Sequence, residues 1–568
     1  MAGRPNPRAL VAGVAAAAVG WGLIAPGFAP ATAAPADDPA VPPQFVIHGA
    51  GWGHGVGLPQ WGAFGMAKAG YDATSIVTYY YQGTTVSPVQ DDMDIRVNLL
   101  YQTGTVAVRS EPMDDSGGAV EVTVGPNVTV GGPADVFRFT VRDAGVGVQR
   151  IAGGQTSDLG AAPSVTVRWA GTRNPGSAAG GPTLLNVAGS KGGLDSSGHR
   201  YRYGSLELAP VSTKNGLRLN AVNVVRLHDE YLYGISEVSS SWPDAALQSQ
   251  ALAARTYALS KVAGSPRTAC GCHVDDGGGP YYDQTFTGWG KASAAKGDRW
   301  LAAVNATMAS ENAGLAILYN GQPIRAFYSS SSGGATQSVQ DVWGGTLAYV
   351  QTVPDPWSLV PENPNHDWAV TISQDRMARA FGVPVVTQVA IAERYSSGVT
   401  KTLAAVAGDG RTVTLSGARA QSAFGLKSHH LSWIEYPGGP AGPDTAAPAP
   451  PAAAPAPAPE APPAAEPQAG VKQRTVSLLT PTAVAVASGS RYKVVGIVRP
   501  ARAKLKAWRQ QLVDGQWVTV AKDKTSAKGR YRFVVKRAKP ESAGTYRVLV
   551  VRKKAVVGVS PEFTVAVS

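Results

Sequence analysis

The most constraining stretch of this sequence covers residues 229–259 and reads DEYLYGISEVSSSWPDAALQSQALAARTYAL. It predicts a short aromatic strand or turn, an isolated acid at Glu237, a serine-rich break and a long alanine-rich helix. The break has the features of a helix start, because Ser241 can cap, Pro243 suits the first turn and Asp244 lies near the positive end. Glu237 is therefore expected within about one turn of this helix.

The predicted helix carries one arginine, Arg255, between two groups of apolar residues. At roughly 100° per residue, alanines and leucines fall on both sides of Gln248 and Arg255. An unpaired buried charge costs several kcal/mol, so Arg255 requires a partner. We expect that partner to be Glu237 or an anionic or hydroxyl-rich ligand; the alternative is a purely structural Glu–Arg pair that ties a loop to the helix.

This run resembles the signature of the SpoIID/LytB family, which comprises stage II sporulation protein D and the LytB amidase enhancers. The resemblance implies a lytic transglycosylase that cleaves peptidoglycan glycan strands. Its catalytic residues would be Glu237, as acid and base, and Arg255, the family's helix arginine. This chain has Gln248 where the family has a lysine. An amide keeps hydrogen bonding but loses the charge, so we place Gln248 among the substrate-binding residues. The departure also favours a second function, a non-catalytic wall-binding protein that enhances a separate cell-wall amidase.

A glycine-rich segment near the N-terminus, residues 45–86, resembles another part of the same family. Glycines at every second position from 51 to 57 exclude a regular helix and predict a strand edge or tight loop. Helices are expected over 60–69 and 72–81. The resemblance suggests glycan contact at His54 and Gln60, and a structural turn with a capped histidine is the alternative. Because many relatives carry this segment near the C-terminal end of the domain, its order here looks permuted.

Two further segments after the central helix also resemble the family. The first, YDQTFTG over residues 282–288, places Gln284 among the substrate-binding residues. The second follows a predicted hairpin at Asn320-Gly321 and reads AFYSSSSGG. It places Tyr328, Ser331 and Gly333 at the cleft, where hydroxyls and free N–H groups suit sugar recognition. With a closing motif near 434, the resemblance covers residues 45–434.

The expected chemistry needs one carboxyl group, because a lytic transglycosylase uses the same acid to protonate the glycosidic oxygen and then to accept a proton. No second acid stands out near Glu237 in the motif, whereas a hydrolase would usually have one ~5–10 Å away. A helix N-terminus and Arg255 would lower the pKa of Glu237. Burial against Trp242 and the tyrosines would raise this pKa, as a general acid requires.

The chain has only two cysteines, Cys270 and Cys272, and His273 follows directly. A disulfide, free thiols and a structural zinc site at these three residues are all possible interpretations. Zinc normally takes four ligands, and this cluster offers three at most. No cofactor is required for the expected reaction.

The length of 568 residues predicts more than one domain, and the pattern predicts an α+β fold. We expect a signal peptide over 1–33, with a membrane anchor as the alternative. A SpoIID-like domain follows over 34–436; it has a central Ala-rich helix and a part rich in short antiparallel strands over 90–227. A Pro/Ala-rich linker over 437–471 leads to an Ig-like β-sandwich over 472–568. No later stretch reaches the ~18 apolar residues of a membrane span, so the protein is expected to be secreted to the cell wall.

The C-terminal module from Lys472 onward is strongly basic. It has 21 lysines and arginines against four acids, a net charge of +17, while the whole chain is +12 and the preceding residues therefore sum to −5. Such a module is expected to bind anionic wall polymers through long-range, salt-sensitive attraction. Solubilising charge is the alternative. Nucleic acid is not an expected partner, since the chain is exported and no recognition motif is present.

Overall fold

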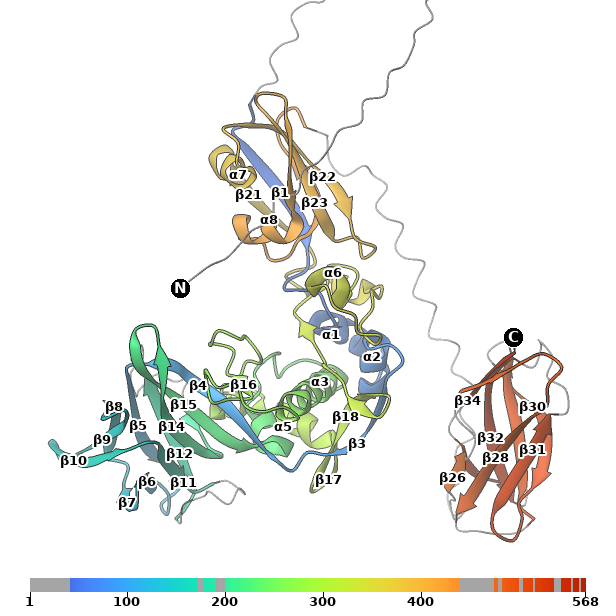
Figure 1. The fold of residues 1–568 in the computed structure, drawn as a ribbon, viewed down its shortest axis with the longest axis horizontal. Helices are drawn as coiled ribbons and strands as arrows, with labels where there is room; N and C mark the ends of the chain where they lie inside the picture. Colours follow the sequence, from blue (N-terminus) through green and yellow to red (C-terminus); the bar gives the residue numbers. More distant parts are fainter. Residues whose placement is uncertain are drawn as a thin grey trace, which may run out of the picture.

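The computed structural model describes residues 41–171, 178, 180–189, 194, 200–439 and, in the C-terminal module, 475–478, 483–499, 504–513, 516–535, 543–552, 555–560 and 563–567. The expected signal peptide and residues 440–471 of the expected linker lie outside these residues. The described residues form an α+β structure with three hydrophobic cores (Figure 1). Two of the three cores belong to the range 34–436, which the sequence presented as one unit.

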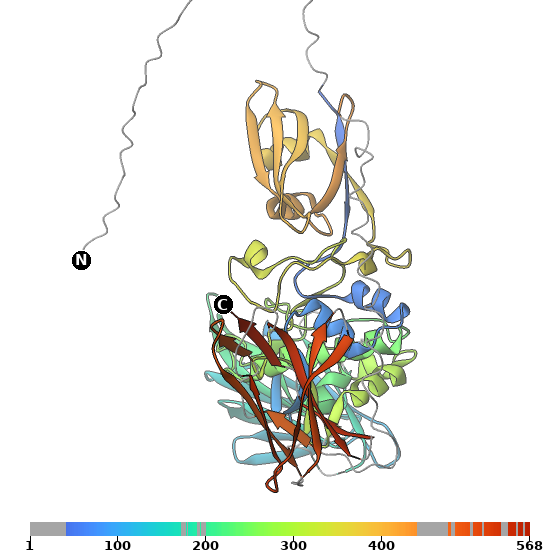
Figure 2. The same ribbon diagram turned by 90° about the vertical axis from the view of Figure 1, so that its right-hand side faces the viewer.

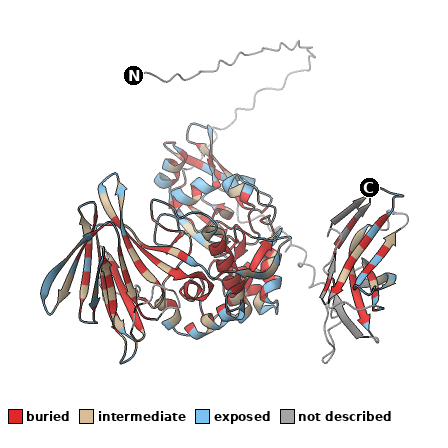
Figure 3. Ribbon diagram, turned by 60° about the horizontal axis from the view of Figure 1, so that its bottom comes forward, coloured by how far each residue is buried: buried red, intermediate tan, exposed pale blue. Residues whose placement is uncertain are grey.

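The first core contains two antiparallel sheets over the region predicted to be rich in strands. One sheet has the order β10-β9-β8-β5-β12-β13, and the other has the order β16-β4-β15-β14-β11-β6-β7 with β16 parallel to β4. The strands are β4 (Asp94–Thr103), β5 (Thr105–Pro112), β6 (Val120–Val124), β7 (Asn127–Gly131), β8 (Val136–Arg142), β9 (Gly145–Ala152), β10 (Gln155–Ala162), β11 (Val165–Trp169), β12 (Thr183–Gly189), β13 (Arg200–Tyr201), β14 (Ser205–Thr213), β15 (Gly216–Arg226) and β16 (Val274–Asp275). The pairings among β4 to β15 are antiparallel, as predicted. Buried and partly exposed residues alternate along several of these strands (Figure 3).

A group of helices completes the first core, with α3 (Asp244–Val262) at its centre. Helices α1 (Gln60–Lys68), α2 (Ala73–Tyr80) and α5 (Gly297–Ala306) pack against it, as does a small sheet of β3 (Thr85–Gln90), β17 (Met308–Ser310), β18 (Ala313–Tyr319) and β19 (Gln322–Pro323). Most of α3 is buried on all sides, which explains its alanine content, since small side chains allow close packing of neighbours.

The start of α3 differs from the prediction in one respect. The helix begins at Asp244 as expected, but its N-cap is Pro243 and no side chain caps it. The Ser241 hydroxyl instead forms a 2.8 Å hydrogen bond with the Ser239 hydroxyl. The predicted capping by Ser241 is therefore wrong, because the proline at 243 sets the helix boundary two residues later.

The second core joins the N-terminal strand to the C-terminal part of the same range. Strand β1 (Gln44–Ala50) lies between β21 (Trp368–Ser373) and β25 (His430–Glu435) in an antiparallel sheet (Figure 2). A second sheet of β22 (Val386–Arg394), β23 (Thr400–Ala407) and β24 (Thr412–Ser416) packs with helices α7 (Gln374–Phe381) and α8 (Gly417–Phe424). Because β1 belongs to this core, the chain leaves it at Ala50 and enters the glycine-rich segment directly.

The C-terminal module has a core of its own. One sheet contains β26 (Thr475–Leu478), β28 (Tyr492–Arg499) and β31 (Arg530–Val535); the other contains β27 (Ala483–Val486), β29 (Lys506–Val513), β30 (Gln516–Lys524), β32 (Gly544–Arg552), β33 (Ala555–Val559) and β34 (Phe563–Val567). Buried side chains from both sheets, such as Val494 and Val548, form the core. The Ig-like topology remains a prediction. Within the described residues, no helix combines the length and the apolar character needed to cross a membrane.

Candidate functional site

The glycine-rich loop (residues 51–57) and the serine-glycine loop (residues 326–334) lie directly against each other, although they are far apart in the sequence. Strand β2 (Leu58–Pro59) pairs in parallel with β20 (Tyr328–Ser329). The backbones of Trp52 and Ser331 exchange hydrogen bonds of 2.9 and 3.1 Å. A Cβ atom on Gly57, which has φ +76°, would lie 2.0 Å from the carbonyl oxygen of Phe327, so only glycine allows this approach. The N-terminal segment thus supplies one side of a site whose other residues come from the middle of the chain.

These loops border an open groove of about 840 Å³. Five of the residues predicted from the sequence line it, namely His54, Gln60, Glu237, Gln284 and Tyr328. The sequence did not single out the other side chains of the lining, which include Trp52, Tyr257, Tyr281, Tyr282, Asp283, Thr285 and Trp343. Some of these residues lie next to a predicted residue in the sequence, as Asp283 and Thr285 lie next to Gln284. This proximity in the sequence is the one signal that could have identified them.

Glu237 reaches the groove because its segment pairs with the chain before α4 (Trp289–Ser293). The Ser236 N–H donates to the Thr285 carbonyl at 2.8 Å, and the Thr287 N–H donates to the Gly234 carbonyl at 2.9 Å. The Glu237 carboxylate then accepts a 2.6 Å hydrogen bond from the Thr285 N–H at Oε1. This short ladder fixes the carboxylate at the groove wall.

Burial raises the pKa of Glu237 above the ordinary range of a glutamate. Hydrogen bonds from the Thr285 N–H, the Tyr328 hydroxyl and Gln60 favour the charged form and offset part of this shift in pKa. Burial is the largest effect on this pKa, and it acts in the direction that a general acid requires.

A chain of buried hydrogen bonds holds Glu237 from behind. The Tyr231 hydroxyl donates to Gln284 Oε1 at 2.8 Å, Gln284 Nε2 donates to the Tyr328 hydroxyl at 2.9 Å, and that hydroxyl donates to Glu237 Oε1 at 3.0 Å. Burial and the Glu237 charge raise the pKa of Tyr328 well above the ordinary value of a tyrosine, so Tyr328 remains a donor. The chain thus orients the Oε1 oxygen of the carboxylate.

Asp283 is a second carboxylate in the lining, but its environment suits a different role. It accepts hydrogen bonds from Arg267 at 2.6 and 2.9 Å and from the Tyr257 hydroxyl at 2.7 Å, and Lys261 lies 3.0 Å away. Burial opposes ionisation, but these partners outweigh it and lower the pKa of Asp283. Asp283 is thus an ionised, neutralised carboxylate, and Glu237 is the acid in this groove with a raised pKa.

Arg255 does not pair with Glu237, and the expected partnership is wrong. Its guanidinium is completely buried and donates to the Asp91 carboxylate, to the His228 carbonyl at 2.8 Å and to the Thr307 hydroxyl at 3.0 Å. Asp91 also contacts His228 Nδ1 at 2.5 Å. Arg255 is therefore a structural residue whose charge is paired with the Asp91 carboxylate. It does not line the groove.

Three other predicted residues also lie outside the lining of the groove. Ser331 is buried, and its hydroxyl accepts from Asn363 Nδ2 at 2.9 Å. Gly333 has φ +81°, and a Cβ atom there would lie 2.5 Å from His430 Nδ1, so this glycine serves close packing. Gln248 lies half-buried on α3. The lysine-to-glutamine departure from the family therefore lies away from the Glu237 carboxylate.

His54 combines both predicted roles. It lines the groove, and its Nδ1 accepts a 3.0 Å hydrogen bond from the Val56 N–H within its own turn. Burial lowers the pKa of His54 to about 4, so its ring is neutral at physiological pH. A neutral ring with its Nδ1 occupied can contact a sugar but is not poised to accept a proton there.

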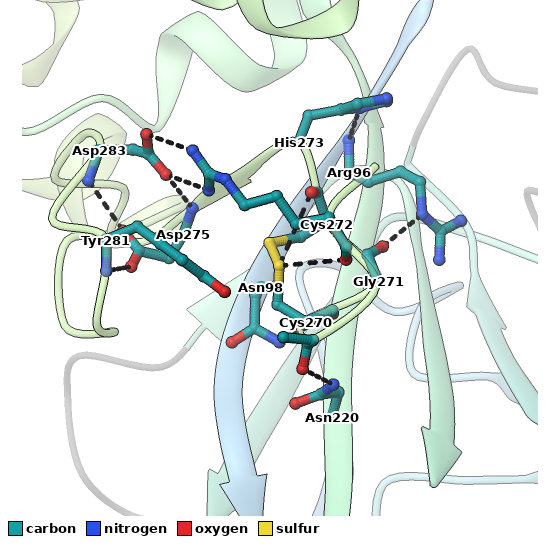
Figure 4. The surroundings of a disulfide bond; sticks show 12 residues. Arg96, Asn98, Asn220, Cys270, Gly271, Cys272, His273, Asp275, Tyr281 and Asp283 are labelled. Carbon is teal, nitrogen blue, oxygen red and sulfur yellow. Dashed lines mark hydrogen bonds and ion pairs between the residues drawn. A yellow bond between two sulfur atoms is a disulfide. The ribbon is translucent and has the colours of Figure 1, made fainter. Parts of the chain in front are cut away.

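Cys270 and Cys272 form a disulfide, one of the interpretations that the sequence left open (Figure 4). Both cysteines are completely buried, and neighbouring side chains hold the turn, since Arg96 donates to the Gly271 carbonyl at 2.7 Å. His273 Nδ1 accepts a 3.1 Å hydrogen bond from the Arg96 N–H. Of the three interpretations, zinc binding by Cys270, Cys272 and His273 does not fit this structure, because both sulfurs are in the disulfide and neither is a thiolate. Across the described residues no group of three or more potential ligands is placed to hold a metal ion.

Known proteins resemble this chain in the region that carries Glu237. The family model described as stage II sporulation protein matches residues 215–310. Stage II sporulation protein D of Bacillus subtilis (strain 168) is 26% identical over 216 residues, which cover 36% of this chain and 60% of that protein. The amidase enhancer of the same organism is 29% identical over 142 residues, covering 25% of this chain and 16% of that protein. An uncharacterized protein of Brachyspira hyodysenteriae (strain ATCC 49526 / WA1) is 49% identical over 41 residues, covering 7% and 11%.

The chain thus spans about 60% of the length of the sporulation protein that it matches, and less of the other two relatives. The family model covers the ladder at Glu237 and the helix that follows it, whereas the groove segments at His54 and Tyr328 lie outside the residues that it matches. These matches support the assignment of this chain to the SpoIID/LytB family.

Proposed function

We propose that this protein is a peptidoglycan lytic transglycosylase that cleaves glycan strands with Glu237 as its single acid and base. The observation that carries the proposal is the environment of the Glu237 carboxyl group. It lies on the wall of an open groove, is held by donors from two separate segments, and has a pKa raised by burial. A carboxyl group whose pKa is raised by burial and that lines a groove is equipped to give a proton to a ligand.

In the proposed reaction, protonated Glu237 donates its proton to the glycosidic oxygen as the bond from that oxygen to the anomeric carbon breaks. The C6 hydroxyl oxygen of the same sugar attacks the anomeric carbon, and its proton returns to Glu237. The new strand end is a 1,6-anhydro sugar, and no water is consumed. The carboxyl group ends in the protonation state in which it began, so one acid suffices.

The hydrogen-bonded chain behind Glu237 supports this cycle. Tyr328 and the Thr285 N–H stabilise the carboxylate that exists between the two proton transfers. Asp283 is neutralised by Arg267 and Lys261, so it lacks the free charge of a second catalytic carboxylate. Arg255 enters this proposal only as a structural residue.

The experiment is an incubation of the purified protein with glycan strands that have been stripped of peptides, with the products identified by mass spectrometry. Anhydro ends are expected with the unmodified protein and not with Glu237→Gln. Glu362→Gln is the matched control, since Glu362 lies at the surface and pairs with Lys68. Anhydro ends formed equally by Glu237→Gln would remove this carboxyl group from the mechanism.

The second candidate function is a wall-binding protein that enhances a separate amidase. The match to a relative named amidase enhancer favours it, as does Gln248 in place of the family's lysine. The same incubation separates the two functions. Co-sedimentation with glycan strands without anhydro products, together with faster release by an added cell-wall amidase, would support the enhancer.

We infer that the C-terminal module binds anionic wall polymers. On the exposed side of its sheet, Lys506 of β29 lies directly opposite Lys524 of β30, and Trp508 lies opposite Lys522. Like charges directly opposite each other destabilise a sheet, and an anionic ligand would relieve that repulsion. Both proposed activities act outside the cytoplasmic membrane, in keeping with the signal peptide expected over residues 1–33.

A further inference from the structure

The exposed aromatic side chains of the described residues are concentrated in one place. Four of them have more than a third of their surface accessible, and all four line the groove of Glu237. They are Trp52 (52% exposed), Trp343 (49%), Tyr281 (36%) and Tyr282 (78%). Large apolar side chains that remain accessible in one groove indicate a surface that is covered when a ligand binds.

These four residues belong to two walls. The tryptophan wall consists of Trp52 and Trp343, which lie beside the loop that carries Tyr328. The tyrosine wall consists of Tyr281 and Tyr282, in the loop that ends at Thr285. The loop beside each wall donates one hydrogen bond to Oε1 of Glu237. The donor is the Tyr328 hydroxyl beside the tryptophan wall and the Thr285 N–H beside the tyrosine wall. Glu237 therefore lies where the two walls meet.

The backbone at Tyr282 indicates that its position serves a ligand and not the fold. Tyr282 has φ +50°, a left-handed conformation that is uncommon for a bulky residue and costs about 1–3 kcal/mol. Its side chain is nearly free of protein contacts, so burial recovers none of this cost. The buried Asp275 carboxylate holds the turn by accepting the N–H groups of Tyr281 at 2.7 Å, Tyr282 at 3.2 Å and Asp283 at 2.9 Å.

Neighbouring side chains also contact the rings of Trp52 and Trp343. The ring of Trp343, the last residue of α6 (Val339–Trp343), packs against Phe327 and His54 at centroid distances of 4.9 and 5.1 Å. Lys427 lies 5.7 Å from the ring centroid of Trp52 and donates to Asn365 Oδ1 at 2.9 Å. Rings held this firmly lose little side-chain entropy when a ligand stacks on them.

The charges of the lining narrow the chemistry of the ligand. Among the described residues, no lysine or arginine lines the groove, and the acids of the lining are Glu237 and Asp283. Lys427 and Arg267 lie beside the rings of Trp52 and Tyr281, and Arg267 is paired with Asp283. The lining itself gives a polyanion no countercharge, whereas the apolar C–H faces of sugar rings suit aromatic side chains, and their hydroxyl and amide groups suit the polar lining.

From these observations we propose that the two walls are sugar-stacking subsites on either side of Glu237, so that the groove holds a glycan strand across the bond to be cleaved. The inference rests on the proposed function for the class of ligand. It adds that a substrate must reach both walls, with at least one ring on the tyrosines and one on the tryptophans. Short oligosaccharides that reach one wall are then weak ligands.

The test measures binding by calorimetry in the Glu237→Gln background, where cleavage cannot confuse it. The probes are the β-1,4-linked hexamer and dimer of N-acetylglucosamine. We expect Tyr281→Ala/Tyr282→Ala and Trp52→Ala/Trp343→Ala each to weaken hexamer binding about fivefold or more. Dimer binding is expected to respond to one pair at most. A smaller loss from either pair with the hexamer, or weakening of dimer binding by both pairs, overturns the proposal.

Two single variants separate binding from folding. Tyr282→Gly relieves the left-handed strain, so its unfolding temperature is expected to be unchanged or higher while hexamer binding weakens. Tyr282→Phe keeps the ring and is expected to retain binding. If the Glu237→Gln protein with all four aromatic residues does not bind the hexamer, the proposed function fails as well; if it binds but ignores the aromatic substitutions, only this inference fails.

Discussion

The Tyr328 hydroxyl donates a 3.0 Å hydrogen bond to Oε1 of Glu237, and Tyr328 in turn accepts from Gln284. This bond joins the serine-glycine loop to the acidic residue of the central motif. It favours the ionised carboxylate, in opposition to the burial that raises the pKa of Glu237. This hydrogen bond and burial together set the balance between the protonated and the ionised forms of Glu237, both of which the proposed cycle uses.

Tyr328→Phe removes this donor while keeping the ring. The pKa of Glu237 is expected to rise further, because the lost bond favoured the charged form, and the alkaline limb of the activity profile should move to higher pH. Turnover should fall by about tenfold to a hundredfold, as for the loss of a hydrogen bond to a charged group. Rates of anhydro-end formation across pH measure both effects. Tyr79→Phe is the control, since its hydroxyl donates to Pro354 instead; an equal loss in both variants would contradict a specific role for Tyr328.

Arg255→Met leaves the Asp91 carboxylate buried without its main partner. The free energy of unfolding is expected to fall by about 3–5 kcal/mol, measured by chemical denaturation. The double variant Arg255→Met/Asp91→Leu removes both charges and should recover part of the loss. At temperatures where each variant remains folded, anhydro-end formation should persist. A variant that is stable but inactive would restore Arg255 to the catalytic set.

Asp355 gives a stability prediction with a definite sign. It is fully buried and accepts hydrogen bonds from Tyr80 at 2.7 Å, from Ser332 at 2.5 Å and from Ser358, and burial raises its pKa to about 6. A carboxyl group with a raised folded-state pKa stabilises the fold fully below its unfolded pKa of 3.8, and this contribution is lost as pH rises through about 6.

The free energy of unfolding should therefore decline between about pH 4 and 6, with a contribution from Asp355 on the order of 3 kcal/mol. Asp355→Asn should flatten this part of the profile, although it lowers stability overall because an amide N–H₂ meets the same donors. Asp115→Asn, at an exposed position, is the control and should leave the slope unchanged. An unchanged slope in Asp355→Asn would show that Asp355 does not titrate in this range.

The C-terminal module provides a prediction that is independent of catalysis. Exchange of Lys506, Lys522 and Lys524 for glutamine should weaken binding to isolated anionic wall polymers several-fold at low salt. Both proteins should converge near 1 M salt, where the screening length is about 3 Å. A control with glutamine at Lys214, Lys296 and Lys401, which lie outside the module, changes the net charge equally. Equal weakening by both sets would mean that total charge, and not this face, determines binding.

The sequence predicted the local elements well because their signals are local. Asn320-Gly321 forms the expected two-residue turn, with φ of 51° and 77°. Helices α1 and α2 lie within the predicted ranges 60–69 and 72–81. The glycine-rich loop was predicted from spacing alone, and the closeness of Gly57 to Phe327 gives the physical reason for it.

The partners of the site residues could not be predicted in the same way. Asp91 is 164 residues from Arg255, and nothing near Asp91 in the sequence distinguishes it from an ordinary acid at the start of a strand. Tyr282 and Asp283 directly precede Gln284, which the sequence analysis identified. Their roles, however, depend on contacts with Arg267 and with the Asp275 carboxylate. Tertiary packing decides which residues far apart in the sequence form an ion pair. The periodicity of the sequence does not predict such pairs.

The most direct test of this account is the formation of 1,6-anhydro ends from peptide-stripped glycan strands, followed by mass spectrometry for the unmodified protein, Glu237→Gln and Glu362→Gln. We predict anhydro products from the unmodified protein and from Glu362→Gln at similar rates, and none from a folded Glu237→Gln. Equal product formation by Glu237→Gln, or no anhydro product from the unmodified protein on strands that it binds, would contradict the central role of this carboxyl group.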